Sequence, residues 1–166
     1  MAQKPSQRNF ALMGENLFRI VNKLVDNKRV CRLLKYQDTT PFAQDKPDIE
    51  GTDLLHKQII IVPRIPENGI ECSFIIVVFD QFTINPANPD FKVCRIRFDI
   101  VCPYSEWVVN DADSLRPYLL MQEIDTMFNQ KELNGLGTLQ FTHSTPLVLS
   151  PQMGGYSMYY QINEFN

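Results

Sequence analysis

Residues 91–134, FKVCRIRFDIVCPYSEWVVNDADSLRPYLLMQEIDTMFNQKELN, predict a long strand that is followed by an acidic turn and a helix. Apolar and charged residues alternate along the first part, in the order Cys94, Arg95, Ile96, Arg97, Phe98, Asp99 and Ile100. Successive side chains of a strand point to opposite faces, so this strand has one apolar face and one charged face. Such a half-buried strand is typical of an antiparallel or mixed sheet. We expect it to cover residues 91–102 and to end at Pro103, because proline cannot donate to a strand ladder.

The second part of the segment predicts a helix that covers the apolar face of the sheet. Side-chain oxygens of Asp111, Asp113 and Ser114 can accept hydrogen bonds from the free amides of a first helical turn. Pro117 suits that turn, where its missing N–H costs little. Apolar residues then recur at helical spacing, at Leu120, Ile124, Met127 and Phe128. We expect the helix to stop at Asn134, Gly135 and Gly137.

The N-terminal part of the chain predicts a helical hairpin. Residues 10–25 form an amphipathic helical pattern with one apolar face. This face carries Met13, Leu17, Ile20, Val21 and Leu24. Asn27 can cap a second, shorter helix that runs to about Leu34. Residues 1–8 are polar, and we expect them to form a flexible tail.

Strand patterns occur in consecutive runs on either side of the predicted central helix. Residues 58–62 and 70–79 precede the long strand, and the apolar run 74–79 indicates burial on both faces. Turn residues at 85–90 lead into the long strand, and further strand patterns follow the helix at 138–143, 147–149 and 156–165. The order βββαββ after a helical hairpin predicts an α+β fold. It consists of an antiparallel or mixed sheet backed by a central amphipathic helix, and it is not a doubly wound parallel sheet.

The composition is that of a single domain that covers residues 1–166. Hydrophobic residues make up 44% of the chain, enough to form a core. The net charge of −3 argues against a protein that binds nucleic acid through its overall charge. No apolar run reaches about eighteen residues, so we expect no membrane span, and the N-terminus lacks the apolar centre of a signal peptide.

The cysteines predict buried, reduced thiols. Cys31, Cys72, Cys94 and Cys102 form no CxxC pair, and the chain has two histidines, so a zinc site is poorly supported. Cys94 and Cys102 fall on the apolar face of the predicted long strand, where cysteine behaves as a small apolar residue. Reduced thiols imply assembly in a reducing compartment.

Three groups of charged residues are candidate surfaces for contact with other subunits or partners. The basic cluster of the helical hairpin comprises Arg19, Lys23, Lys28, Arg29, Arg32 and Lys35. The long acidic loop at 36–57 carries Asp45, Asp48, Glu50 and Asp53. The charged face of the long strand carries Arg95, Arg97 and Asp99. In an oligomer, the acidic loop of one subunit could meet the basic helices of its neighbour; a DNA-binding patch and solvated faces are the alternatives.

The sequence contains no recognised reaction centre. His56 and His143 have no nucleophile at a motif spacing, and no P-loop, GxSxG or HExxH motif is present. We therefore expect no catalytic residue, no metal and no cofactor. An alternative is a small metal-dependent nuclease that uses Asp48, or Asp90 together with Asp99. The lysine that such sites carry after the second acidic residue is missing after Asp99.

Four segments carry a family resemblance. They are NFALMGENLFRIVNKLVDNKRVCRLLKY at 9–36, VCRIRFDIVCPYSEWVVNDADSLRPYLLMQEIDTMFN at 93–129, GLGTLQF at 135–141 and GGYSMYYQINEFN at 154–166. In pattern and order they resemble small virion proteins of tailed bacteriophages, specifically tail terminators and head–tail joining proteins of the neck. The resemblance covers most of the chain, and no single motif in it is a signature.

The resemblance implies a structural role without catalysis. Tail terminators are α+β subunits that close into a ring, commonly a hexamer, at the head-proximal end of the tail tube. The ring stops tube polymerisation and presents a docking surface to the connector of the filled head. The implied partners are further copies of the chain, the tail tube protein and head–tail connector or adaptor proteins, with non-specific contact to DNA in the lumen and no membrane.

The implied location is the tail or neck of the virion, after assembly in the host cytoplasm. Another neck, tail-completion or adaptor protein is the alternative within the same class.

Overall fold

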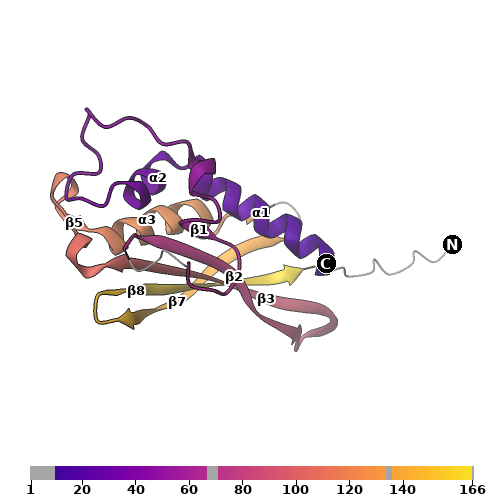
Figure 1. Ribbon diagram of the computed structural model, residues 1–166. Coiled ribbons are helices and arrows are strands. Elements are labelled where there is room, and N and C mark those ends of the chain that lie inside the picture. The colour runs from indigo at the N-terminus through magenta and orange to yellow at the C-terminus, as the bar shows by residue number, and fades with distance from the viewer. Residues whose placement is uncertain (1–9, 67–70, 134–135, 166) are drawn as a thin grey trace.

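The computed structural model describes residues 10–66, 71–133 and 136–165, and it has the α+β architecture that the sequence predicts (Figure 1). Two N-terminal helices, α1 (Phe10–Asp26) and α2 (Lys28–Lys35), meet at Asn27. The Asn27 side chain accepts a hydrogen bond from the Val30 amide at 3.0 Å, which confirms the predicted cap. The predicted tail at 1–8 lies outside the described residues.

The main sheet has six strands in the order β1-β2-β3-β8-β7-β6. Their bounds are β1 Ile59–Ile60, β2 Phe74–Asn85, β3 Asn88–Pro103, β6 Glu132–Leu133, β7 Gly137–Ser150 and β8 Met153–Phe165. β1 runs parallel to β2, and the other paired strands are antiparallel, so the sheet is mixed. The predicted long strand is β3, and it lies in the middle of this sheet.

Within the described residues, the three α-helices lie on one face of the sheet, which we call the inner face (Figure 1). The third helix, α3 (Arg116–Phe128), is the predicted central helix. Between β3 and α3, the short strands β4 (Val108–Val109) and β5 (Ser114–Leu115) form a separate antiparallel pair. Single 3₁₀ turns occupy Gly51–Leu54, Tyr104–Glu106 and Asn110–Ala112. We call the opposite side of the sheet the outer face.

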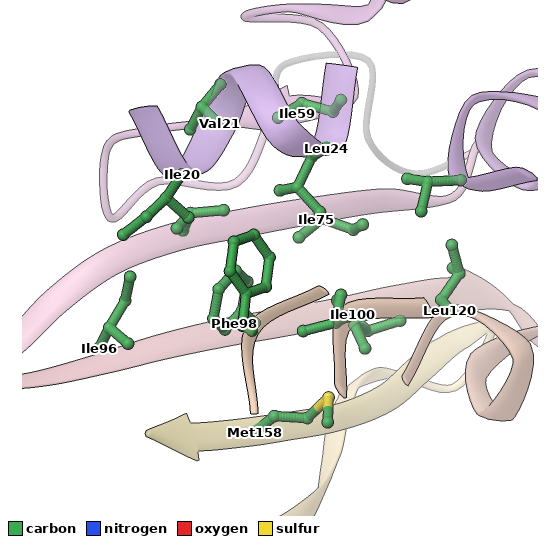
Figure 2. Packing of buried hydrophobic residues seen from close by; sticks show 14 of the residues in the cluster. Ile20, Val21, Leu24, Ile59, Ile75, Ile96, Phe98, Ile100, Leu120 and Met158 are labelled. Carbon is green, nitrogen blue, oxygen red and sulfur yellow. The ribbon is translucent and has the colours of Figure 1, made fainter. Parts of the chain in front are cut away.

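The core fills the space between the helices and the inner face, as Figure 2 shows. The apolar face predicted for the long strand is fully buried at Cys94, Ile96, Phe98, Ile100 and Cys102. Ile20, Val21 and Leu24 of α1 and Leu120, Ile124 and Phe128 of α3 meet this face from above. The ring of Phe98 stacks on that of Phe128, with their centroids 5.2 Å apart. Hydrophobic burial is therefore what holds the helices to the sheet.

The predicted N-terminal cap of α3 is wrong. Asp111 lies in a 3₁₀ turn, Asp113 adopts a left-handed backbone with φ of 46°, and Ser114 is part of β5. The helix begins at Arg116 after Leu115, which makes no side-chain cap. The Arg116 amide instead donates to the Trp107 carbonyl at 2.6 Å. The segment that leads into β4 thus satisfies a free amide at the start of the helix. Pro117 lies in the first turn, as predicted.

The same helix also ends earlier than predicted. Its last residue is Phe128, and Gln130 adopts a left-handed backbone with φ of 55°. The Gln130 amide donates to the Leu139 carbonyl at 2.7 Å, so pairing with β7 draws the chain out of the helix. Of the predicted stop, Asn134 and Gly135 lie outside the described residues, and Gly137 begins β7.

The strand boundaries differ from the prediction. β1 covers only two residues of the predicted strand 58–62, and β2 runs to Asn85, beyond the predicted end at 79. Residues 88–90 belong to β3, so only Pro86 and Ala87 separate β2 from β3. The two strands predicted at 138–143 and 147–149 are one strand, β7, which runs through Pro146. An edge strand tolerates proline where no neighbour needs its N–H. Position 155 of β8 has no room for a side chain, because a Cβ there would approach the Ile100 carbonyl oxygen to 1.9 Å.

A buried arginine joins the helical layer to the segment before α3. The Arg116 side chain is fully buried, and burial lowers its pKa. Its guanidinium donates to the backbone carbonyls of Leu33, Asp38 and Glu106, the last at 2.8 Å. These carbonyls belong to the end of α2, the loop after it and the turn after β3. One side chain therefore fixes three segments that are distant in sequence.

Arg116→Met is expected to lower the free energy of unfolding by about 3 kcal/mol, because it leaves three carbonyls without their donor. Urea unfolding followed by circular dichroism measures the change. The matched control is Arg64→Met at an exposed arginine, which we expect to change stability by less than about 0.5 kcal/mol. Equal effects of the two substitutions would contradict the role assigned to Arg116.

Candidate functional site

Three of the six residues of the basic cluster, Lys28, Arg29 and Arg32, form ion pairs within the chain. Lys28 forms a 2.9 Å ion pair with Asp48 of the acidic loop. Arg29 forms a 2.7 Å ion pair with Glu123 of α3, and its guanidinium lies over the Phe42 ring at 4.3 Å from the centroid. These contacts tie α2 to its neighbours, which reduces the positive charge that the cluster can offer to DNA.

Arg32 holds the acidic loop against α2. Its guanidinium donates to the carbonyls of Pro41 at 2.9 Å, Ala43 at 2.7 Å and Lys46 at 3.1 Å. It also lies 3.3 Å from an Asp48 carboxylate oxygen. The pKa of Asp48 lies below its ordinary value. The main cause is Lys28, through its hydrogen bond and its positive charge, and the charge of Arg32 adds to the effect. We predicted that the acidic loop of one subunit meets the basic helices of its neighbour. At Lys28, Arg32 and Asp48 this pairing occurs within one chain.

The other members of these two groups lie at the surface. Lys23 and Lys35 are exposed, and Arg19 is exposed beside Asn16, with a 3.5 Å hydrogen bond between them. Asp45, Glu50 and Asp53 are exposed as well. The structure does not gather these residues into one site.

The charged face predicted for the long strand is a connected network on the outer face. Arg95 makes two 2.9 Å hydrogen bonds to the Asp80 carboxylate, one from Nε and one from Nη2. Arg97 Nε lies 3.0 Å from Asp99, and its Nη1 lies 3.7 Å from Asp80. Ser157 donates to Asp99 at 2.6 Å. The sheet itself thus satisfies these charges, and Asp99 is only 7% exposed.

Sequence reasoning missed Asp80 because its position depends on a bulge. Phe79 pairs with Ile96 and Gln81 pairs with Arg95, so Asp80 is an extra residue in β2. A bulge redirects a side chain relative to strict alternation. Asp80 is thereby available to both arginines of the neighbouring strand.

A column of three side chains crosses the outer face beside this network. The rings of His143 on β7 and Tyr159 on β8 are stacked, with centroids 4.3 Å apart and planes at 10°. The Arg95 guanidinium lies 4.9 Å from the centroid of the same Tyr159 ring. A recess of about 340 Å³ opens next to the column. It is lined by Gln81, Thr83, Val93, Arg95, Thr142, His143 and Gln161.

An exposed apolar surface lies at the free end of the β2–β3 hairpin; we call it the tip patch. It consists of Phe10, Phe82 and Ile84. The Phe10 and Phe82 rings meet edge to face at 5.4 Å. Ile84 is 66% and Phe82 39% exposed, although both are large apolar side chains.

A second apolar surface lies between α3 and β7; we call it the edge groove. It is a hollow of about 300 Å³ lined by Tyr118, Met121, Gln122, Asp125, Asn129, Phe141 and Met158. Tyr118 is 46% and Phe141 41% exposed. Tyr118 also shares a 2.9 Å hydrogen bond with the hydroxyl of Tyr156. Tyrosine and methionine are enriched in the centres of protein interfaces.

The acidic residues weighed for a nuclease are far apart. Asp90 and Asp99 both lie in β3, and nine residues of strand span about 30 Å. Asp48 is held by Lys28 and Arg32 on the helical side. In residues 10–66, 71–133 and 136–165, no group of three His, Cys, Asp or Glu is placed to hold a metal ion. Within the same described ranges, no helix is long and apolar enough to cross a membrane.

A double-mutant cycle on Asp80→Ala and Arg95→Ala tests the network. We expect a coupling energy of about 1 kcal/mol, since the pair has two charge-assisted hydrogen bonds but Arg95 keeps part of its side chain in solvent. Thermal or urea unfolding of the four proteins gives the value. A coupling energy near zero would mean that the two bonds do not form in solution.

Comparison with known proteins gives one family. The model of the YomW family matches residues 27–162, which is more than half of the chain. No curated protein and no solved structure gives a significant match.

Proposed function

We propose that this chain, which belongs to the phage-associated YomW family and is therefore a phage-related protein, is a structural subunit of the virion. In this proposal it resembles a tail terminator: copies form a ring that caps the tail tube and joins the tail to the head connector. The proposal includes no catalysis. A different neck, tail-completion or adaptor protein remains the alternative within the same class.

The observation that carries the proposal is the pair of exposed apolar surfaces toward opposite edges of the sheet. The tip patch belongs to the side of β2 and the edge groove to the side of β7, with β3 and β8 between them. A ring is built from heterologous contacts, in which one surface of each subunit meets a different surface of the next. Two distinct apolar surfaces on opposite sides are what such a contact requires.

The shapes of the two surfaces support pairing of this kind. The tip patch projects at the end of a two-strand hairpin, whereas the edge groove is hollow. Exposed aromatic and aliphatic side chains that enter a hollow lined by tyrosine and methionine give the buried centre of a typical interface. An apolar pairing would leave the remaining surface charges of the helical side for other partners.

In this account the mechanism is surface complementarity. One end of the closed ring binds the last ring of tail tube protein, and the other end offers the connector a different surface, so the tube cannot grow further. The lumen admits DNA. The site of action is the tail or neck of the virion after assembly in the host cytoplasm.

Light scattering of the purified protein tests ring formation. A hexamer of the 19.2 kDa chain would weigh about 115 kDa. Phe82→Asp with Ile84→Asp places charges on the tip patch, and Tyr118→Asp with Phe141→Asp places them in the edge groove. We expect each double variant alone to be monomeric, because each lacks one of the two surfaces.

Mixing the two double variants is the sharper experiment. Each keeps one intact surface, so the mixture is expected to form a dimer and nothing larger. Val108→Asp, at an exposed apolar residue outside both surfaces, is the matched control and should keep the mass of the unaltered protein. An unaltered protein that is monomeric at every concentration would remove the ring as a property of the chain alone. An assembly that survives both double variants would show that other surfaces form it.

A further inference from the structure

The recess on the outer face has a more polar lining than the edge groove. One row of the sheet supplies Gln81, Arg95 and Gln161, which are paired across β2, β3 and β8. Thr83, Thr142 and His143 complete the polar part. The lining has no aspartate or glutamate. It therefore presents a guanidinium, an imidazole, two hydroxyls and two amides toward one space.

The guanidinium of Arg95 is oriented before any ligand arrives. Nε and Nη2 are engaged by Asp80, which is not part of the lining, and the guanidinium lies over the Tyr159 ring. Nη1 donates no hydrogen bond to another group within the described residues. A guanidinium held by a carboxylate on one side can still donate from its remaining N–H groups to an oxyanion on the other.

The imidazole of His143 is oriented in the same way. Thr142 Oγ1 donates to the Tyr159 carbonyl at 3.1 Å and lies 3.0 Å from His143 Nδ1. This contact holds the Nδ1 side of the ring, and the tautomer of His143 decides which of the two atoms donates. Stacking on Tyr159 fixes the plane of the ring, and Nε2 is left for solvent or a ligand.

We propose that this recess binds a phosphate group through Arg95 and His143, which both contact the Tyr159 ring, with the hydroxyl of Thr83 and the amides of Gln81 and Gln161 completing the shell. Phosphate is an acceptor of several hydrogen bonds, and arginine recognises it with defined geometry. The recess of about 340 Å³ is larger than one phosphate ion, so the group belongs to a phosphorylated molecule. A phosphodiester of DNA and a small phosphorylated metabolite share this chemistry.

The charge balance of the outer face limits the affinity. Asp80 and Asp99 offset Arg95 and Arg97, so binding depends on oriented donors more than on net charge. We expect a dissociation constant for inorganic phosphate on the order of 1 mM. The inference does not rest on ring formation, since all lining residues belong to one chain.

The test is a titration of the full chain with inorganic phosphate at constant ionic strength, followed by nuclear magnetic resonance of the arginine and histidine side chains. Saturable shifts of Arg95 Nε and the His143 ring are expected. Arg95→Gln should raise the dissociation constant about tenfold or more. Arg64→Gln, at an exposed arginine outside the recess, is the control and should bind as the unaltered protein does.

A second variant guards against a folding defect in Arg95→Gln. His143→Ala with Thr83→Val leaves the Arg95–Asp80 pair in place, and it should also weaken binding. A parallel titration with a short DNA duplex separates the two sources of phosphate. Binding of the duplex that is tighter, salt-dependent and lost in Arg95→Gln assigns the recess to the DNA backbone, whereas binding of inorganic phosphate alone assigns it to a small molecule. The proposal is overturned if neither probe gives saturable shifts, or if Arg95→Gln and its control bind equally.

Discussion

The two faces of β3 require different surroundings: one must be buried against apolar side chains, and the charges of the other must be paired. On the inner face, the alternate residues from Cys94 to Cys102 are fully buried and provide the surface on which α1, α2 and α3 pack. On the outer face, the intervening charges cannot be covered by apolar helices, because burial of unpaired charge costs several kcal/mol. The sheet meets this demand with its own residues, Asp80 from a bulge and Ser157 from β8. The α-helices of the described residues lie on the inner side. The outer face is open at the charged network and, farther along, is covered by a second apolar cluster that includes Phe74, Val101 and Met153.

Two arginines hold the segments of the helical side together through hydrogen bonds within the chain. Arg116 is buried among backbone carbonyls, and Arg32 satisfies the carbonyls of the acidic loop. A connection of more than twenty residues is thereby held against α2 with little regular structure of its own. Part of the apparent complementarity of a basic hairpin and an acidic loop is internal, because Asp48 pairs with Lys28 and Arg32 of the same chain. The proposed contacts between subunits are apolar and lie at the tip patch and the edge groove.

The sequence was sufficient for the features that depend on local periodicity. Alternation located β3 and its buried face, and helical spacing located α1 and the apolar stripe of α3. It was insufficient where a tertiary partner decides the local structure. Of the residues predicted to cap α3, Asp111 lies in a 3₁₀ turn and Ser114 pairs with β4. Gln130 leaves the helix because Leu139 accepts its amide. The column of Arg95, Tyr159 and His143 draws on three strands, so no short motif could reveal it.

The central claim is that one subunit's tip patch enters its neighbour's edge groove. Site-specific cross-linking tests it most directly. In a Cys72→Ser background, which removes the one cysteine that is not buried, Ile84→Cys and Phe141→Cys are introduced together and oxidised. The account predicts covalent multimers that end at a single closed size, whereas the two single variants give no such series. Monomers alone, or a series no different from that of either single variant, would contradict it.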